Sequence, residues 1–92
     1  MEEVIRVRLP EKDEVIGVVI QLLGFAKMRV KCLDGVERIC RVPGRLSRKL
    51  WIKEGNYVLV KPWSIQKDRG DIIYKYSKTE VMWLKEKGYL SD

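Results

Sequence analysis

The amino-acid sequence predicts a mainly β fold, in which five short strands close into a small barrel, with a short helix between the third and fourth strands and a C-terminal α-helix. Three observations support this expectation. Apolar and charged residues alternate over 27–33, which is the period of a strand that buries one face. Asp34-Gly35 follows at once and marks a hairpin turn. Ser77 and Glu80 have the spacing of a helix capping box, so a helix is expected to begin there.

Length and composition favour one small, highly charged globular domain. The chain has 92 residues, of which 46% are hydrophobic and 35% are charged, and a chain of this length buries one modest core. We expect an N-terminal arm over 1–13, the barrel over 14–76, and the C-terminal helix and tail over 77–92. The acidic start is unlike a signal peptide, and no apolar run approaches the ~20 residues that span a bilayer. A cytoplasmic protein with no membrane partner is therefore expected.

The first strand is expected over 14–23, because β-branched residues dominate there, and Gly17 within it suggests a bend. Gly24 and Phe25 then turn the chain into the alternating strand. The later elements are a third strand over 37–42, a helical turn over 44–49, a fourth strand over 57–60, a loop over 64–70, a fifth strand over 71–76, and a helix that runs from the capping box to Lys87 and ends at Gly88.

The second and third strands are expected to present cations on one outer face. On the second strand, the alternation places three cations on the outer face, namely Lys27, Arg29 and Lys31. We expect a two-residue turn at Asp34-Gly35. Such a turn would set Arg38 opposite Lys31 and, further along, Cys40 opposite Arg29, with both pairs on the outer face. Like charges that face each other across strands cost stability, and a bound polyanion would relieve that repulsion.

Basic charge is most concentrated over 37–51. There Arg38, Arg41, Arg45, Arg48 and Lys49 are interleaved with Ile39, Val42, Leu46, Leu50 and Trp51. Apolar positions can anchor such a segment in a core while the cations face an anion. Because the chain carries 19 Lys and Arg against 13 Asp and Glu, we expect the anion to be RNA. The alternative is a solvated cationic face, and composition alone does not separate the two.

Other chemistry is poorly supported by the sequence. It contains no histidine to serve as general acid or base, and no phosphate-binding glycine loop. A zinc site would need carboxylates to complete the ligand set of Cys32 and Cys40. We therefore expect these two cysteines to be reduced, apolar strand residues. Neither an enzyme nor a cofactor or metal is expected.

The predicted order of elements suits an OB-type barrel, in which the face of strands 2 and 3 and the neighbouring loops bind single-stranded nucleic acid. The candidate RNA-binding side chains are Lys27, Arg29, Lys31, Arg38, Arg41, Arg45, Arg48, Lys49, Trp51, Lys61 and Trp63. Among the aromatic residues, Trp51 and Phe25 can each be read as core residues or as RNA contacts. Trp63 is favoured as a surface residue, and Trp83 is expected to pack the C-terminal helix on the barrel.

Six blocks of sequence are shared with one known family. They are V-I-G-V-V-I-Q-L-L-G-F at 15–25, R-V-K-C-L-D-G at 29–35, R-I-C-R-V-P-G-R-L-S-R-K-L-W-I at 38–52, V-L-V-K-P-W at 58–63, D-I-I-Y-K-Y at 71–76 and W-L-K-E-K-G-Y-L at 83–90. Through these blocks the chain resembles, from about Arg6 to Leu90, archaeal translation initiation factor 1A, the counterpart of bacterial initiation factor 1. The block at 38–52 is the most specific, since a random basic protein would very rarely match it.

The resemblance implies an OB barrel that binds rRNA in the decoding region of the small ribosomal subunit, at the aminoacyl-tRNA site. There such factors assist initiator tRNA binding, start-codon selection and recruitment of other initiation factors, so these are the implied partners. The positions that match the family's RNA-contacting residues are Lys27, Arg38, Arg41, Arg45, Arg48, Lys49 and Trp51. Ser47 departs from the pattern, because relatives often carry a basic residue there. The basic N-terminal arm and long acidic C-terminal tail of eukaryotic members are not matched, so functions of those tails are not expected.

Two other binding functions remain as alternatives. A cold-shock-like chaperone that coats single-stranded RNA would carry several stacking aromatics on strands 2 and 3, and there is none between Lys27 and Val42. A structural ribosomal protein would carry a long basic extension. A monomer is expected, because no second apolar stripe is evident.

Overall fold

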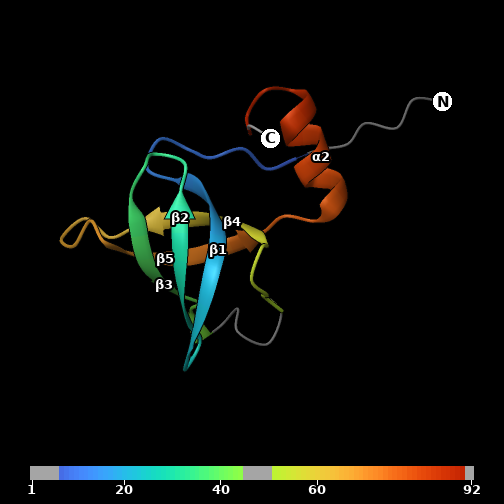
Figure 1. The fold of residues 1–92 in the computed structure, drawn as a ribbon. Coiled ribbons are helices and arrows are strands. Elements are labelled where there is room, and N and C mark those ends of the chain that lie inside the picture. The colour runs from blue at the N-terminus through green and yellow to red at the C-terminus, as the bar shows by residue number, and fades with distance from the viewer. Residues whose placement is uncertain (1–6, 45–50, 91–92) are drawn as a thin grey trace.

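The computed structural model describes residues 7–44 and 51–90, which form a closed β-barrel with one helix packed at its end (Figure 1). The elements are β1 (Val15–Gly24), β2 (Lys27–Cys32), β3 (Glu37–Arg41), β4 (Tyr57–Pro62), β5 (Arg69–Lys75) and α2 (Lys78–Glu86). The strand order around the barrel is β1-β2-β3-β5-β4, and β4 pairs back to β1. The predicted five-stranded barrel and C-terminal helix are confirmed. The helical turn expected over 44–49 falls, apart from Gly44, outside the described residues.

The pairing of β3 with β5 is parallel, whereas every other neighbouring pair of strands in the barrel is antiparallel. A parallel pair needs a long connection, and β4 with its flanking segments supplies it. The parallel pairing brings the start of β5 against β3. This contact places side chains from two distant parts of the sequence on the same surface as β2.

Strand β1 takes part in two pairings because it wraps around the barrel. Gly17 pairs with Cys32 on β2 and with Val58 on β4. A Cβ atom on Gly17 would lie 2.4 Å from Cγ1 of Val30, so glycine allows the strands to close at this point. The register irregularities of β1 lie further along, between Val19 and Gln21 and again near the end of the strand.

The β2–β3 connection is a three-residue loop over 33–35 rather than the expected two-residue turn. The Cys32 amide donates to the Val36 carbonyl at 3.0 Å, and Gly35 has a φ of 88°. A glycine in the left-handed region at the third loop position is typical of three-residue hairpin loops. The hairpin was predicted correctly, but the length of its loop was wrong.

The longer loop shifts the register by one residue. Lys31 pairs with Glu37, not with Arg38, and Cys40 pairs with Met28. Because side chains alternate between the faces of a strand, this shift moves Arg38 and Cys40 from the outer face to the interior. The predicted pairing of Arg38 with Lys31 is therefore wrong, since Lys31 faces the opposite charge of Glu37. A like-charge pair occurs instead where Lys27 faces Arg41.

The buried apolar residues form two clusters. The barrel interior is filled by Val19, Met28, Val30, Cys32, Cys40, Val42, Val58, Val60 and Ile72. The second cluster lies between the barrel and α2 and contains Ile16, Leu59, Tyr76, Leu84 and Leu90, with Trp83 packed against it. The expectation that Cys32 and Cys40 are reduced strand residues is confirmed, although Cys40 was expected on the outer face and is buried. The expected packing of Trp83 is also confirmed.

The capping box predicted for the C-terminal helix is present. The Glu80 amide donates to Oγ of Ser77 at 3.2 Å, and the Ser77 amide donates to Oε1 of Glu80 at 2.8 Å. The other carboxylate oxygen of Glu80 accepts the hydroxyl hydrogen of Tyr74 on β5 at 2.6 Å. Past the helix, the Gly88 amide donates to the Lys85 carbonyl at 3.1 Å, which confirms the predicted stop. No helix in the described parts of the chain has the length and apolar character needed to cross a membrane.

Candidate nucleic-acid interface

Cations from four adjacent strands lie on one outer surface of the barrel, which we call the basic face. Its members are Lys27, Arg29, Lys31, Arg41, Lys61 and Arg69. The alternation predicted for β2 is confirmed, because its three cations are exposed while the residues between them are buried. Lys27 pairs with Arg41, Arg41 pairs with Asp71, and Asp71 pairs with Lys61. Directly paired residues point to the same side of a sheet, so these four side chains form one row across the barrel.

Part of this charge is compensated within the protein. Arg29 lies 4.0 Å from Glu37, Lys61 lies 3.6 Å from Asp13, and Arg41 lies 3.1 Å from Asp71. Exposed pairs of this kind are weak and leave most of each cation available to a ligand. Within the described ranges, Lys27, Lys31 and Arg69 form no ion pair. The basic face therefore carries a net positive charge.

Arg38 is not part of the basic face. Its side chain is 6% exposed, and two of its nitrogens bond to the two carboxylate oxygens of Asp34 at 3.0 and 2.9 Å. Its Nε donates to the carbonyl of Lys67 at 2.8 Å. The hydrogen bonds from Arg38 hold the pKa of Asp34 below its usual range. The predicted outward orientation of Arg38 is wrong, and its contacts instead join the β2–β3 loop to the β4–β5 loop.

Three of the predicted RNA-binding residues cannot be placed. Arg45, Arg48 and Lys49 lie outside the described residues. Their expected contribution stays a prediction from the sequence.

The aromatic candidates divide into exposed and half-buried side chains. Phe25 is 99% exposed and Trp51 is 79% exposed, so the core alternative for both residues is wrong. Trp63 is half-buried at the end of β4. Its indole Nε1 donates to Oδ1 of Asp71 at 3.2 Å, and the Arg41 guanidinium lies 5.2 Å from the centroid of its ring.

The β1–β2 turn consists of Phe25 and Ala26. This turn lies at the end of the barrel away from α2 (Figure 1). Phe25 and Ala26 have φ values of 51° and 58°. Positive φ at both central residues suits the twist of a two-residue hairpin, but the left-handed region is strained for residues with a side chain, at about 1–3 kcal/mol each. The barrel thus holds a large apolar ring in water on a strained turn.

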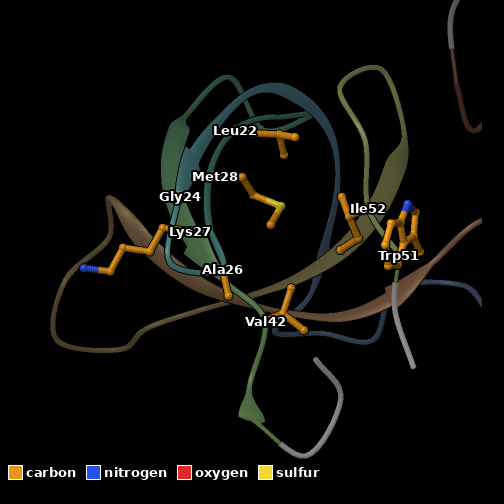
Figure 2. A pocket seen from close by; sticks show the side chains of 8 residues that line it. All are labelled: Leu22, Gly24, Ala26, Lys27, Met28, Val42, Trp51 and Ile52. Atoms are coloured by element: carbon orange, nitrogen blue, oxygen red, sulfur yellow. The ribbon is translucent and has the colours of Figure 1, made fainter. Parts of the chain in front are cut away.

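A hollow of about 290 Å³ opens beside this turn. Figure 2 shows Met28 pointing into it and Lys27 pointing away, with Trp51 and Ile52 at the opposite wall. Its wall is largely apolar, and the exposed ring of Trp51 borders it. The hollow adjoins the basic face, because Lys27 is among the residues that line it.

Two residues of this surface were missed by sequence reasoning, namely Arg69 and Asp71. Arg69 fell within the predicted loop over 64–70, and Asp71 was given no role at this surface. In the structure Arg69 pairs with Ile39, and Asp71 with Arg41, through the parallel β3–β5 contact. The topology of an OB barrel was the signal that could have found them, because it predicts that these strands meet.

The described chain offers little to a metal ion. Burial raises the pKa of Cys40 to about 12 and also raises that of Cys32, so both thiols stay protonated and are poor ligands at neutral pH. In the arm, the carboxylates of Glu11, Asp13 and Glu14 lie close together. Their neighbours are protein groups, because Asp13 pairs with Lys61 and Glu14 lies 3.9 Å from Arg8 and accepts the Glu11 amide at 3.0 Å.

Comparison with known proteins identifies the family. The family model described as Translation initiation factor 1A / IF-1 matches residues 4–92. Translation initiation factor 1A of Archaeoglobus fulgidus is 53% identical over 91 residues, covering 97% of this chain and 94% of the relative. The Pyrococcus abyssi protein of the same name is 52% identical over 91 residues, covering 98% of this chain and 80% of the relative.

A solved structure shares the fold. The solution structure of translation initiation factor 1 from the Wolbachia endosymbiont of Brugia malayi superposes with a TM-score of 0.56 at 37% identity, covering 75% of this chain and 87% of that one. It is an OB-fold protein, in agreement with the predicted barrel type. These relatives are translation initiation factors, a non-enzymatic class. The chain therefore belongs to the translation initiation factor 1A / IF-1 family.

Proposed function

We propose that this factor binds rRNA in the decoding (aminoacyl-tRNA) site of the small ribosomal subunit through its basic face, and that it there promotes initiator tRNA binding and start-codon selection. The observation that carries the proposal is the set of exposed cations on β2 and β3, of which Lys27 and Lys31 form no ion pair within the described ranges, in a chain of the initiation-factor family. Its partners are that rRNA, the initiator tRNA complex and other initiation factors.

The geometry favours docking on folded RNA over coating of single strands. The outward positions of β2 and β3 are Lys27, Arg29, Lys31, Glu37, Ile39 and Arg41. None of them is aromatic, whereas proteins that coat single strands stack successive bases on aromatic platforms. Two exposed aromatics lie beside these positions instead: Phe25 is in the turn that leads to Lys27, and Trp51 borders the hollow that Lys27 also lines. Such an arrangement suits phosphates along the cationic row and an unpaired base at the rim.

The proposal is tested by removing two unpaired cations. In the double variant Lys27→Ala and Lys31→Ala, we expect the affinity for purified archaeal small ribosomal subunits to fall about tenfold or more near 0.1 M salt, because two phosphate contacts are lost. The slope of log affinity against log salt should also become less steep by about 1.5. The matched control is Lys78→Ala with Lys85→Ala, which removes the same charge from exposed positions on α2 and should leave binding nearly unchanged.

Competition separates the specific site from general RNA binding. Excess unstructured RNA should fail to displace the labelled factor from the subunits. If such RNA competes nucleotide for nucleotide, or if both double variants lose the same affinity, the proposed rRNA site is wrong. A cold-shock-like activity would then be the better description.

A further inference from the structure

Asp71 is one of two carboxylates, with Glu37, that lie among the strand cations of the basic face. Asp71 pairs with Arg41 on β3 and with Lys61 on β4, so it stands between two cations in the cross-strand row. Its side chain is 30% exposed. A negative charge here weakens the attraction of the surface for phosphates. The hydrogen bonds of Asp71 indicate what this side chain contributes to the basic face.

A single oxygen of Asp71 fixes two neighbouring groups. Oδ1 accepts hydrogen bonds from Nε of Arg41 at 3.1 Å and from Nε1 of Trp63 at 3.2 Å. The Arg41 guanidinium lies 5.2 Å from the centroid of the Trp63 ring, within the range of a cation–π contact. The Asp71 carboxylate thus binds Nε of Arg41, and the Trp63 ring packs against the face of the guanidinium.

This mode of pairing leaves the far end of Arg41 available. The hydrogen bond to Asp71 uses Nε, and Nη1 and Nη2 of Arg41 have no hydrogen-bond acceptor in the described parts of the chain. The side chain is 57% exposed. The two terminal nitrogens form a planar pair of donors, which is the geometry that binds phosphate bidentately.

A small hollow lies beside this group. It has a volume of about 130 Å³, and three cations border it, namely Lys27, Arg41 and Arg69, together with the Trp63 ring. Gly70 forms part of its wall, in a position where a Cβ atom would lie 2.7 Å from Cγ1 of Val60. Pockets for drug-sized ligands are larger, at about 300–1,000 Å³. The size and the charge of this hollow suit a single phosphate group.

We propose that this hollow binds one phosphate of the rRNA backbone, and that Asp71 is the positioning residue that directs the terminal nitrogens of Arg41 toward it. The inference rests on the proposed rRNA binding and adds one phosphate subsite and a residue that acts through Arg41. Lys27 and Arg69 supply the remaining positive charge around the phosphate.

The positioning role predicts an effect of opposite sign to that of simple electrostatics. If Asp71 acted only through its charge, its removal would strengthen binding to RNA, because the surface would become more positive. If Asp71 positions Arg41, its removal weakens binding, because the guanidinium loses its fixed orientation. Glu37 provides a matched control, since it is the other carboxylate on this face, is 56% exposed, and lies 4.0 Å from Arg29, which is beyond hydrogen-bond distance.

The experiment measures the affinity of Asp71→Ala, Glu37→Ala, Arg41→Lys and the double variant Asp71→Ala with Arg41→Lys for archaeal small ribosomal subunits. We expect Asp71→Ala to lower the affinity about tenfold and Glu37→Ala to leave it unchanged or raise it. The double variant should lose no more affinity than Arg41→Lys alone, because Asp71 acts through the arginine fork. The indole N–H signal of Trp63, recorded by NMR on the free protein, should shift in Asp71→Ala while the other indole signals and the amide dispersion stay in place.

Three outcomes decide whether Asp71 positions Arg41. An affinity of Asp71→Ala equal to or above that of the parent overturns the positioning role, whereas the loss in Lys27→Ala with Lys31→Ala still supports the rRNA site. Additive losses in the double variant also overturn it. If Asp71→Ala loses dispersion across the whole spectrum, Trp63→Phe takes its place. That variant removes the indole donor to Asp71 and leaves a smaller ring beside Arg41, so it should lower the affinity several-fold; an unchanged affinity overturns the proposal.

Discussion

Strand β3 carries two arginines, Arg38 and Arg41, that are each paired with an aspartate but in opposite ways. Arg38 is 6% exposed, its terminal nitrogens bind both oxygens of Asp34, and its Nε is bound to a backbone carbonyl. Arg41 is 57% exposed and is held through Nε alone. The first side chain has no donor pair left for a ligand, whereas the second has one. The number of engaged nitrogens, and not the presence of an ion pair, distinguishes a structural arginine from one that can bind RNA.

The largest expected effect is on stability, at Arg38. Replacement of Arg38 by Met keeps an apolar stem but removes the donors to the Lys67 carbonyl and to both oxygens of Asp34, which keeps the Val36 amide as a donor. We expect the free energy of unfolding to fall by about 2 kcal/mol, the typical cost of losing charge-assisted hydrogen bonds at a buried site. Urea unfolding followed by circular dichroism measures it. A loss below about 0.5 kcal/mol would place Arg38 in the same class as Arg41.

A smaller effect is expected at Asp34, and it depends on pH. The hydrogen bonds from Arg38 lower the pKa of Asp34 in the folded state, so the unfolded state binds the proton more readily. The stabilisation is therefore complete above the ordinary aspartate pKa of about 3.9 and is lost as the pH falls through the lower folded value. We expect Asp34→Asn to cost about 1 kcal/mol at pH 7 and the difference from the parent to shrink toward pH 2. A difference that is constant between pH 7 and pH 2 would exclude the charged pair as its origin.

The smallest effect on stability is expected at Arg41. Replacement of Arg41 by Ala removes an exposed pair, and such pairs contribute about 0–1 kcal/mol. We expect a change in the free energy of unfolding within about 0.5 kcal/mol, together with a clear loss of affinity for the small ribosomal subunit. The same urea titration and the subunit-binding assay, run on one preparation, sharpen the contrast with Arg38. Equal losses of stability at Arg38 and Arg41 would contradict the distinction drawn between the two arginines.

Local patterns in the sequence were sufficient to predict the strands and the C-terminal helix. The alternation over 27–33 fixed which side of β2 is buried, and the capping box at Ser77 and Glu80 fixed where α2 begins. These signals act over a few residues and depend little on the rest of the chain. They predicted the exposed cations of β2 correctly for the same reason.

The errors arose where one residue or one distant contact decides the answer. Asp34-Gly35 indicated a hairpin, but the sequence did not distinguish a loop of two residues from one of three, and that single residue turned Arg38 inward. The place of Asp71 depends on the pairing of β3 with β5, which are separated by a whole strand in the chain. No local pattern encodes that contact, so the phosphate subsite could not be predicted from the sequence.

The shared carboxylate of Glu80 has a consequence for how the C-terminal segment moves. One oxygen completes the cap of α2 and the other accepts the hydroxyl of Tyr74 on the barrel. A helix of nine residues is too short to persist alone in water. Departure of α2 from the barrel would break the Tyr74 contact, expose Leu84 and weaken the cap at the same time. Undocking would therefore be coupled to unwinding, and a helix released from the barrel would not persist as a free helix.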